Sequence, residues 1–107
     1  MEEVGIDTAV RHAIGGDADA VTWIIAAAAT TDDASVVAMA AVLEGRPDRL
    51  ARAQALATTS RDRQLLAIAG AHLDGQRELV DALARDHLVD HPDSLIVAWI
   101  AAGTPVN

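Results

Sequence analysis

His87 and His91 are the residues of this sequence whose spacing most suggests chemistry. They lie four positions apart, so on a helix both imidazoles project from one face, which is a spacing that metal sites use. A third ligand could be His72 or a carboxylate such as Asp90, but the glutamate of a zinc-protease helix is missing between the two histidines. Two ligands do not complete a metal site. We therefore expect no bound metal, and we expect His87 to hydrogen-bond a neighbouring helix.

No other set of residues indicates catalysis. No grouping of Ser, His and Asp has a recognisable nucleophile context, and Gly15-Gly16 is too short for a phosphate-binding loop. Asp32 and Asp33 are adjacent carboxylates, but they precede a predicted helix, where a carboxylate caps free backbone N–H groups. The sequence predicts a protein that is not an enzyme and uses no cofactor.

Charge is distributed unevenly along the chain, whose formal net charge is −8. Residues 1–45 contain eight acidic residues and one Arg, a net charge of −7, whereas residues 46–107 contain eight acidic residues and seven Arg, a net charge of −1. Nonspecific nucleic-acid binding depends on neutralising phosphates with basic side chains, so we expect no nucleic-acid partner. The acidic half is either a solvated surface or the receptor for a basic partner.

Arg46, Arg49 and Arg52 form the basic patch of the sequence, because their spacing of three aligns them along the exposed side of one helix. One interpretation is that they pair with local acids such as Asp48 and Asp62 for a small energetic gain. The other is that they contact a carboxylate-bearing partner, for example the acidic half of a second copy of the chain.

The elements that must position these residues are helices. Hydrophobic residues make up 51% of the 107 residues but aromatic residues only 2%, so the core consists of short side chains that allow helices to approach closely. The length suits a single domain over residues 1–107. There is no cysteine, and the longest apolar run, Trp23 to Ala29, is far shorter than a membrane span. We expect a cytoplasmic protein without a membrane partner.

An internal repeat of 30 residues organises the chain. Gly15, Gly45 and Gly75 recur at this spacing, and each follows a helical pattern that a left-handed glycine can end. The other boundary in each unit carries Thr, Ser, Asp or Pro, which favour helix starts. Two boundaries in each unit predict a helical hairpin, and the expected helices cover residues 4–14, 19–30, 34–44, 48–58, 62–73, 76–90 and 94–102.

The residues Gly75, Val80, Ala84, Leu88 and Pro92 lie at offsets that match the second-helix half of a tetratricopeptide repeat. The sequence resembles that family, and residues 59–93 look in particular like its bacterial branch typified by tetratricopeptide repeat protein 38. The resemblance implies an all-α fold in which about 3.5 helix-turn-helix repeats form a right-handed superhelix. It also implies a protein-interaction scaffold, and it carries over no catalytic residue.

The last predicted helix is apolar on every face. By repeat arithmetic it is the first helix of a fourth unit whose second helix is missing, so Leu95, Ile96, Trp99 and Ile100 are expected on an uncovered surface. Such a patch usually marks an interaction site. We expect the same helix of a second copy to cover it in a homodimer, with Trp99 as the central anchor.

Three functional hypotheses follow from these residues. The first is a noncatalytic adaptor that binds a protein or peptide on its helical surface. The second is a structural homo-oligomer with no other partner. The third is a small-ligand or metal-binding accessory protein that uses His72, His87 and His91.

Overall fold

The computed structural model describes residues 6–103, and this part of the chain contains α-helices, one short 3₁₀ helix and no strand. The predicted all-α fold with seven helices is confirmed. Residues 4 and 5 of the first predicted helix lie outside the described residues. The elements are α1 (Ile6–Ile14), α2 (Ala18–Ala28), α3 (Ala34–Glu44), η1 (Pro47–Arg49), α4 (Leu50–Leu56), α5 (Ser60–Leu73), α6 (Arg77–Asp90) and α7 (Leu95–Ala101).

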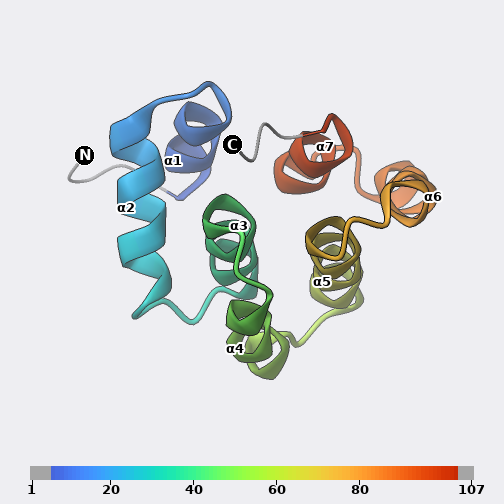
Figure 1. Ribbon diagram of the computed structural model, residues 1–107, viewed down its shortest axis with the longest axis horizontal. Coiled ribbons are helices and arrows are strands. Elements are labelled where there is room, and N and C mark those ends of the chain that lie inside the picture. The colour runs from blue at the N-terminus through green and yellow to red at the C-terminus, as the bar shows by residue number, and fades with distance from the viewer. Residues whose placement is uncertain (1–5, 104–107) are drawn as a thin grey trace.

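Successive helices alternate between an inner ring and an outer layer (Figure 1). The inner helices are α1, α3, α5 and α7, and the outer helices are α2, α4 and α6. Within the ring α3 packs on α5 and α5 packs on α7, while α2 joins α1 to α3. The ring closes because α7 also packs on α1. An open superhelix of the predicted kind keeps its first and last units apart, so this contact differs from that expectation.

Closure of the ring covers the apolar helix α7. Ile96, Val97 and Ile100 are buried, and Leu95 and Trp99 are half-buried. The prediction that this helix leaves all its apolar faces uncovered is therefore wrong for Ile96 and Ile100. The physical reason is that α1, α5 and α6 all pack around α7 within the same chain.

Helix α3 is the centre of the core. Its residues from Ala34 to Val42 are buried, with the exception of the half-buried Ser35. A helix that is apolar on all faces must be surrounded, and here α2, α4 and α5 pack around it. Alanine at many of these positions lets the neighbouring backbones approach closely.

The inner helices end in left-handed glycines. The backbone φ angle is 93° at Gly16, 65° at Gly45 and 74° at Gly75. After Gly45 the next backbone N–H donates to Ala41 O at 2.9 Å, and the equivalent bond follows the other two glycines. The prediction for Gly45 and Gly75 is confirmed, but Gly16 takes this conformation instead of Gly15. The spacing from Gly16 to Gly45 is therefore 29 residues, one fewer than the 30 from Gly45 to Gly75.

Side chains cap the starts of three helices, as the sequence predicted for two of the boundaries. Asp17, Asp33 and Thr59 each accept a hydrogen bond from a backbone N–H two or three residues further on, at 2.9–3.0 Å. Pro47 occupies the first position of η1, where its missing N–H costs no helical bond.

Two arginines cap the carboxyl ends of helices that are distant in sequence. The guanidinium of Arg52 donates to the carbonyl oxygens of Ala28 and Thr31 at the end of α2. Arg77 donates to Ile100 O at 3.1 Å and to the next carbonyl oxygen of α7. Each planar guanidinium thus donates to two carbonyl groups at or just beyond the carboxyl end of a helix.

Substitution of two glycines by alanine should change stability in opposite directions. Gly75→Ala should lower the free energy of unfolding by about 1–2 kcal/mol, because its φ of 74° suits glycine and strains alanine. Gly70→Ala should raise it by about 0.5–1 kcal/mol, because Gly70 lies inside α5 and a new Cβ would meet only Leu50 Cδ1 at 3.8 Å. Urea unfolding followed by circular dichroism measures both, and a shift of the same sign in both variants would contradict the fold.

Candidate functional site

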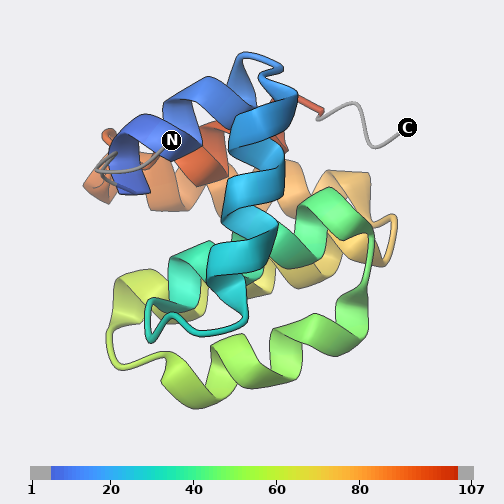
Figure 2. The same cartoon turned by 90° about the vertical axis from the view of Figure 1, so that its left-hand side faces the viewer.

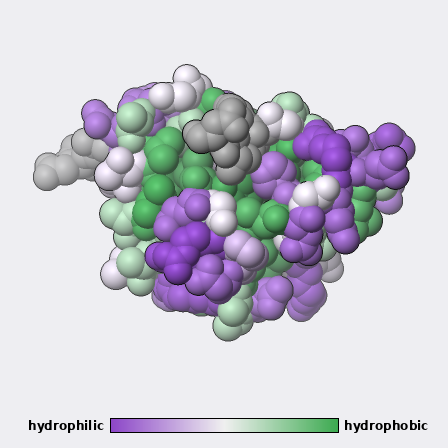
Figure 3. Space-filling model, in the orientation of Figure 1, coloured by the Kyte–Doolittle hydropathy of each residue, from purple (hydrophilic) through white to green (hydrophobic). Residues whose placement is uncertain are grey.

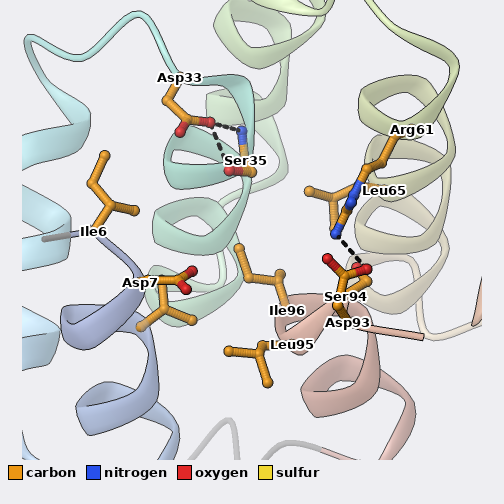
Figure 4. A pocket seen from close by; sticks show the side chains of 11 residues that line it. Ile6, Asp7, Asp33, Ser35, Arg61, Leu65, Asp93, Ser94, Leu95 and Ile96 are labelled. Carbon is orange, nitrogen blue, oxygen red and sulfur yellow. Dashed lines mark hydrogen bonds and ion pairs between the residues drawn. The ribbon is translucent and has the colours of Figure 1, made fainter. Parts of the chain in front are cut away.

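The amino-terminal ends of the four inner helices meet around a hollow of about 270 Å³, here called the central pocket (Figure 4). This arrangement follows from the hairpins, because each outer helix returns the chain to the end at which the next inner helix begins. The pocket is lined by Ile6, Asp7 and Val10 of α1, Asp33 and Ser35 at the start of α3, Arg61 and Leu65 of α5, and Asp93, Ser94, Leu95 and Ile96 at the start of α7.

The floor of the central pocket is apolar. Val10, Leu65 and Ile96 are buried side chains of three different helices. Leu95 is half-buried beside them, and Ile6 is exposed at the edge of the pocket. A ligand that enters the pocket therefore finds an apolar surface below a polar rim.

The rim of the central pocket carries more negative than positive charge. Asp7, Asp33 and Asp93 are exposed carboxylates, and Arg61 is the one cation among the lining residues that the structure describes. Arg61 Nη2 lies 3.3 Å from Asp93 Oδ1. One oxygen of Asp33 accepts hydrogen bonds from the backbone N–H and the hydroxyl of Ser35. Since one of three carboxylates is paired with Arg61, the rim retains a net negative charge.

A hydrogen-bonded trio of the buried His87 and Ser94 and the exposed Gln64 lies next to the central pocket and links α5, α6 and the start of α7. His87 Nδ1 lies 2.7 Å from Gln64 Oε1, and His87 Nε2 lies 3.2 Å from Ser94 Oγ. An amide oxygen only accepts, so Nδ1 carries the proton, and in the neutral imidazole Nε2 accepts from the hydroxyl. The predicted contact of His87 with a neighbouring helix is thus present. Ser94 precedes α7, but its hydroxyl bonds His87 and makes no cap.

Ser94, His87 and Gln64 are arranged like the nucleophile, the base and the orienting acceptor of a catalytic triad. Gln64 is neutral, however, and cannot stabilise an imidazolium as the aspartate of a catalytic triad does. Only 2% of His87 and 7% of Ser94 are exposed, and the two side chains are bonded to each other. We interpret the trio as a structural link between three helices.

The pKa of His87 is held below its ordinary value. Burial is the largest cause, because a charged imidazole loses water of hydration inside the protein. The nearby His91 and Arg61 lower the pKa further, and Asp90 and Asp93 oppose them. His87 is therefore neutral at pH 7, in agreement with its hydrogen bonds.

The three histidines of the metal hypothesis are not brought together. The rings of His87 and His91 have centroids 4.8 Å apart, but both nitrogens of His87 contact Gln64 and Ser94. His72 lies eight residues beyond Gln64 on α5, a distance of about 12 Å along the helix. Burial and Arg77 lower its pKa. Within residues 6–103, no group of three His, Asp or Glu side chains is placed to hold a metal ion.

The predicted basic patch is divided among contacts within the chain. Arg46 pairs with Asp48 at 3.0 Å, Arg49 pairs with Glu44 at 3.5 Å, and Arg52 caps α2. All three arginines are exposed. They do not lie along one helix as predicted, because Arg46 precedes η1 and Arg49 ends it, so that Arg52 alone belongs to α4.

No protein-family model, curated protein or solved structure matches this chain. Its function must therefore be inferred from the geometry of its own residues. Among the described helices, none is long and apolar enough to cross a membrane.

Sequence reasoning missed the central pocket because its residues come from four separate units. Asp7, Arg61 and Ser94 show no common motif, and they meet only because the ring closes. The one usable signal was the position of Asp33 and Asp93 just before two inner helices. Because successive inner helices begin at the same end of the hairpins, these two positions place both carboxylates at one end of the fold.

The free energy of unfolding should decrease as the pH is lowered, because His87 resists protonation in the folded protein. The unfolded chain takes up this proton near a pKa of about 6.5, whereas the folded protein resists it. The contribution of His87 to stability is therefore complete above pH 6.5 and is lost as the pH falls from there toward the lowered pKa of the folded state. Urea unfolding between pH 7 and pH 5 should show this loss.

His87→Gln is the matched variant, because glutamine keeps hydrogen-bonding capacity and removes the titration. The decrease in unfolding free energy between pH 7 and pH 5 should be smaller in His87→Gln than in the wild-type protein. Some decrease should remain, because the pKa of His72 is lowered as well. Equal decreases in the two proteins would show that His87 is not buried in the neutral form.

Proposed function

We propose that this protein is a noncatalytic binding module of the tetratricopeptide type that accepts a basic side chain of a protein or peptide partner in the central pocket. The observation that carries the proposal is the rim of Asp7, Asp33 and Asp93 above an apolar floor. The alternation of inner and outer helices, each pair forming one hairpin, supports the helical-hairpin part of the family resemblance, although the ring is closed.

The chemistry of the pocket favours arginine or lysine as the entering group. Both side chains combine an apolar stem with a charged head, so the stem can lie on Val10, Leu65 and Ile96 while the head reaches the carboxylates. Arginine fits better, because its planar guanidinium can bond two carboxylate oxygens at once.

The overall charge supports a basic partner as well. Residues 1–45 carry a net charge of −7, and this segment supplies Asp7 and Asp33 to the rim. Charge of one sign around a concave site raises the local concentration of an oppositely charged ligand and accelerates its association. The positive ends of the inner helices oppose this effect, but Asp33 caps α3 and Asp7 lies in the first turn of α1.

A noncatalytic role is supported by the hydrogen bonds that already occupy His87 and Ser94. The histidine that bonds a described residue of the central pocket, His87, is buried and bonded on both ring nitrogens. A general base needs access to the proton that it removes. Ser94 borders the pocket, yet its hydroxyl is held by the same histidine.

The binding test uses a fluorescein-labelled peptide of six arginines and follows its fluorescence anisotropy. Asp7→Asn should raise the Kd by roughly threefold to tenfold, because it removes one rim carboxylate without touching a cap. The matched control is Asp86→Asn on α6, which makes the same change of net charge outside the pocket and should raise the Kd much less. A labelled hexaglutamate peptide should not bind.

Equal weakening by the two substitutions would mean that the peptide responds only to net charge, and it would remove the central pocket from the proposal. Methyl chemical shifts give an independent check. Addition of the peptide should shift the methyl signals of Val10, Leu65 and Leu95, and shifts confined to other parts of the acidic half would contradict the assignment.

A further inference from the structure

Helix α2 lies on the outside of the ring, and no other described helix covers its outer face (Figure 2). Its inner side, with Ala20, Ile24 and Ala28, is buried against α1 and α3. The outer side is named here the α2 face. It consists of exposed Ala18, Thr22, Ala26 and Ala29, flanked by half-buried Val21 and Ile25 on one side and half-buried Trp23 and Ala27 on the other.

The outer helix α6 shows what a solvated surface in an equivalent position looks like. Its exposed positions carry charged side chains in every turn, whereas the only charged residue of α2 is Asp19 in the first turn. Figure 3 shows the α2 face edge-on; in this view hydrophobic residues gather left of the centre, and the right-hand side, where α6 lies, is mostly hydrophilic. An outer position in this fold therefore does not by itself explain the apolar α2 face.

The two ends of the α2 face carry opposite charge. Asp17 and Asp19 lie at its amino end, and both are exposed. At its carboxyl end the exposed guanidinium of Arg52 bonds the carbonyl oxygens of Ala28 and Thr31. Beside this end is a hollow of about 370 Å³ that Ala28, Ala29, Val37, Ala40, Asp48, Arg49 and Arg52 line.

We propose that the α2 face is a homodimer interface on which α2 of a second copy packs in the antiparallel direction. A two-fold axis perpendicular to the two helices brings each end of one helix next to the opposite end of the other. Asp17 and Asp19 of one copy then face Arg52 of the second copy, and the same pairing is repeated at the other end. The predicted contact of Arg52 with the acidic half of a second copy is part of this arrangement.

Packing and electrostatics both favour the antiparallel direction. Thr22 and Ala26 lie in the middle of the face, and their short side chains allow two helix axes to approach to about 8–10 Å. Antiparallel helix dipoles attract each other, whereas parallel pairing would place Asp19 next to Asp19 of the second copy. The hollow at the carboxyl end can receive larger side chains from the amino-terminal half of the other helix, such as Val21.

The dimer should be weak. Helix α2 has 11 residues and is about 16 Å long, so one helix pair buries less than the roughly 1,600 Å² of a standard interface. We therefore expect a Kd in the micromolar range. None of the residues that line the central pocket belongs to α2, so dimerisation and binding of the basic peptide are separate properties.

The first experiment measures solution mass by size-exclusion chromatography with light scattering over a range of micromolar concentrations. The wild-type protein should approach twice the chain mass of 11.1 kDa as its concentration rises. Ala26→Glu should keep the mass of one chain, because it places a charge in the middle of the α2 face. The matched control is Ala82→Glu, an exposed alanine of α6, which should dimerise like the wild-type protein.

The second experiment tests the direction of the pair with Asp19→Asn. In the antiparallel dimer this substitution removes an attraction at both ends, and the Kd should rise roughly threefold to tenfold. In a parallel dimer it would remove a repulsion and lower the Kd. The basic peptide should bind Ala26→Glu, measured well below the dimer Kd, at least as tightly as the wild-type monomer.

A wild-type protein that stays monomeric throughout this range would overturn the proposal. A dimer that persists in Ala26→Glu would overturn it as well, because the contact would then lie on another surface. A lower Kd in Asp19→Asn would contradict the antiparallel direction. Loss of peptide binding in Asp7→Asn together with normal dimerisation would leave the proposal intact and would concern the central pocket alone.

Discussion

The structure depends on one constraint, which is that helices with apolar residues on every face must be covered from all sides. Helix α3 is buried along most of its length, and every residue of α7 is apolar. A helix with apolar side chains on every face keeps them from water only when several neighbours pack around it. For α7 these neighbours are α5, α6 and α1, and covering α7 therefore closes the inner helices into a ring.

Ring closure also accounts for the position of the candidate site. It brings the amino-terminal ends of the four inner helices together, so that carboxylates placed near the starts of α1, α3 and α7 surround one hollow. The same closure buries Ser94, whose hydroxyl bonds His87, and that trio fixes the start of α7 against α5 and α6. Arg77 holds the other end of α7 through its carbonyl groups. The α2 face is an exception to the rule that apolar helix faces are covered, since no other described helix packs on it.

The sequence predicted the features that depend on local interactions. Helix ends at Gly45 and Gly75 and helix starts near Asp33 and Thr59 follow from the conformational preference of glycine and from capping oxygens. Contacts between distant units could not be predicted, because a repeat specifies only how one hairpin meets the next. Ile96 and Ile100 were expected at the surface for this reason, but both are buried in α7, around which α1, α5 and α6 pack. Arg52 could not be placed either, because its partners are the carbonyl groups of another helix 21 to 24 residues away.

The contact between α1 and α7 is the central claim, and methyl NOE spectroscopy of the native chain tests it most directly. We predict NOE cross-peaks between methyl groups of Ala9, Val10 or Ala13 in α1 and those of Ile96, Val97 or Ile100 in α7, since both sets are buried and the two helices are in contact. If α7 gives cross-peaks to α5 and α6 but none to α1, the ring is open. The central pocket would then have no fourth side, and the last helix would present an apolar surface to the solvent.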